Sequence, residues 1–334
     1  MKKRLPALAL ALALLTACVR GPDPALTRLM PPEERRLTIY TSHQEEVYGP
    51  VVKEFQERTG VWVQVVTGGT GELLERIADE GEESPCDVMF GGGEESLLNY
   101  VNLFAPYTVS GADLLQPGLR QEGDLWTPFS ALPIVILYNT RLVASGEVSG
   151  WGDLLNEEWR GRIAFADPAV SGSSYTALVT LLFALGKGDA LDRFAANLGG
   201  TVLAQSGEVA EAVALGTFPL GITLEETALK RQAQGDSVAI VYPAEGTSNL
   251  PDGTALMAHA PHPQNARAFL EFVQSPDVQT RVVRDFFRRS VRSDVADRDE
   301  LPDLHLVDYD VQWAAQQKEA LLDRWAELLG EVGP

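Results

Sequence analysis

The sequence predicts an α/β protein whose two lobes enclose a cleft. One observation is the repeated order of short apolar strand, polar or Gly-rich loop and helix in the first hundred residues, which is typical of parallel strands joined by right-handed helical crossovers. A second module of the same kind begins near residue 131. The third observation is the composition: 334 residues, of which 45% are hydrophobic and 22% charged, supply a sizeable core and suggest two domains.

The first module contains three predicted strands and three predicted helices. Apolar residues at helical spacing predict helices over 45–58 and about 72–80, and a third helix opens at Glu94. Short apolar runs predict strands over 37–40, 61–66 and 87–90. Each strand is followed by a loop and then by a helix, so the three loops are expected at one edge of the sheet, where ligands bind in folds of this kind.

The loops of the first module are rich in Gly and in small polar residues. Glycines let a ligand approach the backbone closely, and the free N–H groups of a helix N-terminus hold small anions without a basic side chain. The candidate binding residues of these loops are Ser42, His43, Thr70, Gly71 and Gly92. The alternative is that they serve only as turn and helix-capping residues.

The second module repeats the order. Residues 131–138 form a nearly continuous apolar strand, typical of a strand buried on both faces. A strand at 163–165 leads into a Ser- and Gly-rich loop and a helix over about 174–185. A helix at 208–215 and a strand at 220–224 follow, and this strand carries Glu225 and Glu226 at its carboxyl end. Since neighbouring strand residues point to opposite faces, we expect only one of these glutamates to serve a cleft.

The N-terminus is predicted to be a secretory signal. Residues 1–17 combine a positive start with a short apolar run and small residues just before Cys18, which resembles a bacterial lipobox with Cys18 as the acylated residue. A plain signal peptide with an incidental cysteine is the alternative. The Pro-rich residues 18–35 are interpreted as a lipoprotein tether. The protein is therefore expected to be exported and anchored by lipid in the periplasm or on the outer face of the cytoplasmic membrane.

Charge and cysteine content exclude several classes of function. The formal net charge of −20, and of −23 once residues 1–17 are removed, argues against a nucleic-acid partner and against docking on anionic membranes. Cys86 has no partner if Cys18 carries lipid, so it is expected to be a small buried residue. Four scattered histidines give no zinc pattern, and the sequence lacks a nucleophile elbow, a P-loop and a full dinucleotide fingerprint. We expect no cofactor, no metal and no enzyme activity.

The mature chain resembles the extracellular solute-binding proteins of ABC importers. The closest group is that of the ferric-ion-binding and the phosphonate- or sugar-phosphate-binding proteins. The similarity covers about residues 37–330 and is carried by the segments 37–43, 84–88, 159–163, 166–173, 241–255, 263–269 and 289–292. The resemblance implies a type II periplasmic-binding fold, with lobe I formed by 36–132 plus 248–334 and lobe II by 133–247. It also implies a permease partner, a monomeric protein and hinge closure around a small solute.

The resemblance also bears on the solute. The iron binders of the family use two tyrosines, a histidine and a glutamate; by alignment Glu225 and Glu226 replace the tyrosines, Gly92 replaces the glutamate and His43 lies within one residue of the histidine. The stretch 171–173 matches the anion-holding loop. The expected ligand is thus a small organophosphorus anion, such as 2-aminoethylphosphonate or a sugar phosphate. The expected site in lobe II is Ser171, Gly172, Ser173, Ser174 and Glu225.

Three alternatives remain open from the sequence. They are a ferric-iron-binding importer component, an exported enzyme acting on phosphate esters, and a structural lipoprotein with a degenerate cleft. Two interpretations of Arg289 and Arg292 are also open: one of them adds a positive charge to the site, or, as we expect, both are solvated surface arginines.

Overall fold

A computed structural model describes residues 31–331. Its strands are β1 (Arg36–Thr41), β2 (Trp62–Thr67), β3 (Val88–Gly93), β4 (Thr127–Asn139), β5 (Ile163–Ala164), β6 (Leu220–Leu224), β7 (Val238–Val241) and β8 (Asn249–Leu256). The α-helices are α2 (Glu45–Thr59), α3 (Thr70–Glu80), α4 (Glu94–Leu97), α5 (Gly172–Ala184), α6 (Ala190–Asn197), α7 (Ser206–Ala214), α8 (Glu225–Ala233), α9 (Pro263–Val273), α10 (Pro276–Arg284) and α11 (Val311–Glu331). Within residues 31–331, no helix combines the length and the apolar character that crossing a membrane requires. The predicted signal peptide and most of the predicted tether lie outside the described residues.

The strands form one continuous sheet in the order β2-β1-β3-β8-β4-β6-β5, with β7 also paired to β4. β1 pairs in parallel with β2 and with β3, as the strand–loop–helix order predicts. β8 is antiparallel to both β3 and β4, and β4 is antiparallel to β6 and β7. β5 is parallel to β6, so the sheet has parallel pairs at both ends and an antiparallel centre.

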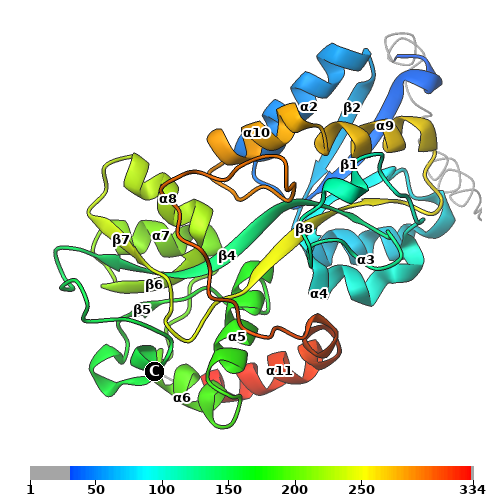
Figure 1. The fold of residues 1–334 in the computed structure, drawn as a ribbon. Coiled ribbons are helices and arrows are strands. Elements are labelled where there is room, and N and C mark those ends of the chain that lie inside the picture. The colour runs from blue at the N-terminus through cyan, green and yellow to red at the C-terminus, as the bar shows by residue number, and fades with distance from the viewer. Residues whose placement is uncertain (1–30, 332–334) are drawn as a thin grey trace, which may run out of the picture.

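The long strand β4 divides the molecule into two lobes (Figure 1). Its first part, through Pro133, pairs with β8, and its second part, from Ile134, pairs with β6 and β7. We call the half with β1–β3, β8, α2–α4, α9 and α10 lobe I, and the half with β5–β7 and α5–α8 lobe II. The apolar run 131–138 is almost wholly buried, so the predicted burial on both faces is confirmed. Each lobe has apolar clusters on both faces of its part of the sheet.

The C-terminal segment contacts both lobes. Thr247 and Leu306 form a β-bridge, and the chain then reaches α11, which lies beside α5 and α6 in Figure 1. Trp325 of α11 is 1% exposed and packs against Phe165 and Phe194 in the core of lobe II. The expected assignment of all of 248–334 to lobe I therefore does not hold for α11. The side chain of Trp325 in this helix is part of the core of lobe II.

Two expected boundaries differ in ways that matter for the site. The helix expected at 174–185 begins at Gly172, because the hydroxyl of Ser171 caps it. Glu225 and Glu226 are not strand residues but the first two residues of α8. The strand alternation that would have turned them to opposite faces does not apply, and both side chains are buried.

Candidate functional site

The three polar loops of lobe I lie in contact with one another. Gly91 and Gly92, at the end of β3, have φ angles of +104° and +105°, a conformation that favours glycine. A Cβ on Gly91 would lie 2.9 Å from Ser42 Oγ, and one on Gly92 would lie 2.7 Å from Thr70 Cγ2. The segments that follow β1 and β2 thus pack directly on the glycine-rich end of β3. A side chain at either glycine would force these loops apart.

The N-terminus of α5 carries the predicted serines of lobe II. Ser171 is the N-cap, and its Oγ accepts a hydrogen bond of 3.3 Å from the N–H of Ser174. The hydroxyl oxygens of Ser171 and Ser173 lie 3.2 Å apart, and Gly172 is exposed. The other N–H groups at the start of the helix have no intrahelical acceptors, so they are available to an anion.

A buried glutamate joins this helix to lobe I. Glu95 in α4 is 2% exposed, and its Oε1 accepts hydrogen bonds from Thr176 Oγ1 of α5 at 2.8 Å and from Tyr309 OH at 2.7 Å. A Cβ on the neighbouring Gly93 would lie 4.0 Å from Thr176 Oγ1. The first turns of α5 therefore lie beside the junction of β3 and α4, where the loops of lobe I gather.

The glutamates at the start of α8 are paired with two arginines of lobe I. Glu225 is 1% exposed, and its two carboxylate oxygens accept hydrogen bonds of 2.9 Å each from Nε and Nη2 of Arg289. Burial works against the charge of Arg289, but the hydrogen bonds from its guanidinium to Glu225 hold its pKa above the usual value. In this conformation Glu225 contacts a protein cation rather than open space.

The second arginine lies in a buried polar cluster. Arg288 Nη1 donates hydrogen bonds to Asp252 Oδ2 at 2.9 Å and to Ser130 Oγ at 3.1 Å, and its Nη2 lies 3.5 Å from Glu226 Oε1. His43 packs beside this cluster, with its Nε2 3.4 Å from Asp252 Oδ2. Burial, with the nearby Arg288 charge, lowers the pKa of His43 well below its usual value, so the imidazole is neutral at pH 7.

The structure corrects the expectation for the arginines. Arg289 and Arg292 are 8% and 5% exposed, so neither is a solvated surface residue. Arg289 reaches the interface between the lobes, whereas Arg292 pairs with Asp294 at 2.7 Å and donates to the carbonyl of Gln274 at 2.9 Å inside lobe I. The sequence pattern did not indicate Arg288 as a site residue; its one signal was its position next to Arg289, which makes a pair of adjacent cations.

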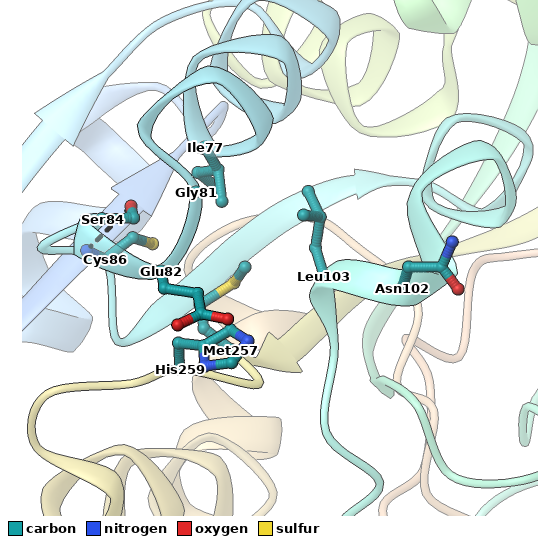
Figure 2. A pocket seen from close by; sticks show the side chains of 9 residues that line it. All are labelled: Ile77, Gly81, Glu82, Ser84, Cys86, Asn102, Leu103, Met257 and His259. Atoms are coloured by element: carbon teal, nitrogen blue, oxygen red, sulfur yellow. Dashed lines mark hydrogen bonds between the residues drawn. The ribbon is translucent and has the colours of Figure 1, made fainter.

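A pocket lies at the opposite end of β3 (Figure 2). Its volume is about 150 Å³, and it is lined by Ile77, Gly81, Glu82, Ser84, Cys86, Asn102, Leu103, Met257 and His259. Cys86 is 1% exposed, which confirms the predicted burial, and burial raises the pKa of its thiol. The pocket contains none of the predicted binding residues. Over residues 31–331, no group of three or more His, Cys, Asp or Glu side chains is arranged to hold a metal ion.

Comparison with known proteins supplies the family context. A family model described as bacterial extracellular solute-binding protein matches residues 37–288. "Iron uptake protein A1" of Synechocystis sp. is 26% identical over 302 residues, which cover 84% of this chain and 82% of the relative. A "Putative 2-aminoethylphosphonate-binding periplasmic protein" of Salmonella paratyphi A is 25% identical over 262 residues, 74% of each chain.

Solved structures share the fold at lower identity. The periplasmic binding protein AfuA from Actinobacillus pleuropneumoniae, with exogenous fructose-6-phosphate bound, matches with a TM-score of 0.80 and 22% identity over 88% of this chain and 98% of that chain. The ferric binding protein from Campylobacter jejuni matches with a TM-score of 0.76 and 20% identity over 89% and 99%. The predicted two-lobed fold and the predicted family resemblance are confirmed.

Proposed function

Because the chain belongs to the family of bacterial extracellular solute-binding proteins, we propose that it captures a small organophosphorus anion between its lobes. Its general role is that of the periplasmic substrate-binding component of an ABC importer, acting with the permease of that importer. We further propose that the protein works as a monomer and that Cys18 carries a lipid anchor. Hinge closure of the lobes would bury the solute.

The observation that carries the proposal is the capped N-terminus of α5 beside the glycine-rich junctions of lobe I. Ser171 and Ser173 present hydroxyls, and Gly172 presents backbone, at the positive end of a helix of 13 residues. Ser42, His43 and Thr70 lie in the loops of lobe I that gather near this end, and His43 is neutral. Such a site suits an anion that is recognised by hydrogen bonds to neutral groups rather than by a cation.

Glu225 belongs to the proposal in a modified role. Both of its oxygens accept hydrogen bonds from Arg289, so a solute amine or hydroxyl would share the carboxylate with that guanidinium. The relative from Salmonella that is named for 2-aminoethylphosphonate and the neighbour with bound fructose-6-phosphate support a phosphorus-containing solute with a polar tail.

Ferric iron is the second candidate, because "Iron uptake protein A1" of Synechocystis sp. is among the relatives. Against it stand the side chains themselves. Glu225 and Glu226 replace the expected tyrosine pair and are already paired with Arg289 and Arg288. A hard trivalent cation would therefore have to displace two guanidinium groups from the carboxylates it needs.

The test is calorimetric titration of protein purified without refolding, after native mass spectrometry has shown what it retains. Inorganic phosphate, 2-aminoethylphosphonate, fructose-6-phosphate and ferric citrate are the four ligands. Tight binding of an organophosphorus ligand supports the proposal, and binding of none of them defeats it. Release of phosphate from fructose-6-phosphate, the one phosphate ester among the four, would indicate the enzyme alternative instead.

A further inference from the structure

Two consecutive glutamates of lobe II face two consecutive arginines of lobe I across the interface between the lobes. We infer that the pairs Glu225–Arg289 and Glu226–Arg288 are a latch that holds the lobes closed in the ligand-free protein. The inference rests on the proposed function in one respect, namely that the lobes open and close. It goes beyond it by assigning closure to side chains of the chain itself rather than to a solute.

The geometry of the latch joins the lobes directly. The Glu225 and Arg289 side chains are 1% and 10% exposed and meet through two hydrogen bonds of 2.9 Å. The Glu226 and Arg288 side chains are 9% and 6% exposed, with 3.5 Å between Oε1 and Nη2. In Figure 1 the segment after α10, drawn in orange, runs past α8. Charges buried this deeply are screened little by salt, whereas the same charges, once separated and hydrated by opening, attract one another only weakly, so the attraction favours the closed form.

Lobe I holds both arginines in place from its own side. The carbonyl of Arg289 accepts a hydrogen bond of 3.0 Å from the N–H of Ala131 in β4, and Arg288 is bound to Asp252 and Ser130. Phe287, just before them, has a φ of +61°, which is a strained conformation for an aromatic residue. Strain of this kind persists only where the surroundings enforce it, and here it accompanies the presentation of two adjacent guanidiniums to lobe II.

Lobe II holds the glutamates at a helix N-terminus, where carboxylates are favoured. Glu226 Oε2 lies 2.6 Å from Lys230 Nζ, and the same ammonium reaches Glu46 Oε1 of lobe I at 2.6 Å. This third contact also crosses between the lobes, at the exposed rim.

Every cation of the latch is paired with a carboxylate of the protein. Arg288 contacts Glu226 and Asp252, Arg289 contacts Glu225, and Lys230 contacts Glu226 and Glu46. Asp297 also lies 3.9 Å from Arg289, so the closed interface needs no anionic solute to neutralise its cations. Opening of the lobes would expose both partners of each pair to water. Removing one partner by substitution would leave the other as a buried, unpaired charge in the closed form, and would therefore favour the open form.

The experiment measures the distance between the lobes without solute. Lys53 of α2 and Leu215 after α7 have exposed side chains in different lobes, and K53C/L215C takes a fluorophore pair for single-molecule energy transfer. We expect one closed population for the otherwise unchanged protein. R289Q and E225Q should each move most molecules to the open distance, and the charge swap E225R/R289E should restore the closed one. R120A, which breaks the exposed pair Arg120–Asp124 inside lobe I, is the matched control and should change nothing.

The outcomes separate the latch from the solute assignment. A ligand-free protein that is already open, or that closes equally well as R289Q, overturns the latch. If circular dichroism shows that R289Q and E225Q do not fold, the distance between the lobes in the protein with an intact latch still tests the inference. E226Q then replaces them as the variant, and because the pair of Glu226 is weaker, its open population should be smaller than that expected for R289Q. A closed ligand-free protein that binds no organophosphorus compound overturns the proposed solute and leaves the latch intact.

Discussion

Two helix caps of the same kind allow a sharp test of the anion site. Ser171 caps α5 in lobe II, where its Oγ accepts from Ser174 N–H at 3.3 Å. Ser275 caps α10 in lobe I, where its Oγ accepts from Val278 N–H at 3.4 Å. Ser171→Ala and Ser275→Ala therefore remove the same local interaction at different places. We expect both variants to be less stable and only Ser171→Ala to bind the solute more weakly.

The magnitudes follow from what each hydroxyl contacts. Loss of a serine N-cap costs about 1 kcal/mol, so both variants should show a similar decrease in the free energy of unfolding. A hydroxyl that also donates to a charged solute contributes roughly 1.5–3 kcal/mol to binding. Ser171→Ala should thus weaken solute affinity roughly 10- to 100-fold. Adding Ser173→Ala, whose Oγ lies 3.2 Å from that of Ser171, should weaken affinity further.

The assay pairs urea unfolding with calorimetric titration of the organophosphorus ligand that binds best. Equal losses of affinity in Ser171→Ala and Ser275→Ala would show that the effect comes from stability and would refute the placement of the anion at α5. A full affinity in Ser171→Ala, with the expected loss of stability, would refute it as well. Only a selective loss in Ser171→Ala supports the reasoning.

Three further predictions concern the anchor, iron and pH. Cys18→Ser should release soluble protein or leave an uncleaved precursor on cell fractionation, and an unchanged membrane fraction would contradict the lipid anchor. Ferric citrate should produce no tyrosinate-to-iron charge-transfer band in visible spectra, because glutamates stand at 225 and 226; a coloured, tight one-to-one complex would overturn the choice of solute. Burial raises the pKa of Glu94 to about 7, so the stability due to its protonated form is present below about pH 4.5 and is lost as the pH rises through 7. Glu94→Gln should therefore raise the free energy of unfolding at pH 8, on the order of 2 kcal/mol, and change it little at pH 4; equal effects in urea titrations at both pH values would contradict this.

The parts of the fold that depend on local pattern could be predicted from the sequence. The order of strand, polar loop and helix predicted β1, β2 and β3 with their parallel pairing, and the long apolar run predicted β4. The same order predicted that the loops holding Ser42, Thr70 and Gly92 would lie together, because parallel strands bring their carboxyl ends to one edge. In each case the information lies in one continuous stretch of chain, such as 36–67 for β1, its crossover helix and β2.

The parts that depend on docking of distant segments could not be predicted. Glu225 and Arg289 are 64 positions apart, and nothing in the local sequence of either states that the other is its partner. The local pattern around Glu225 predicts the end of a strand and that around Arg289 a surface arginine, but the two side chains are buried together as an ion pair. Trp325 likewise packs in the core of lobe II although it belongs to a helix near the end of the chain. No local sequence pattern predicts this contact.

The pairing of the arginines with carboxylates in the interface also bears on how so acidic a protein would hold an anion. A net charge of −20 repels a phosphate at a distance, but screening limits such repulsion to about 8 Å at physiological ionic strength. At the interface, the guanidiniums of Arg288 and Arg289 are neutralised by carboxylates, so they add little positive field of their own. The remaining attraction comes from the N–H groups of the first turn of α5 and from its serine hydroxyls. It acts only at hydrogen-bonding distance. Selectivity for the proposed solute would therefore rest on the fit of its oxygens to these donors, and affinity should vary little with salt.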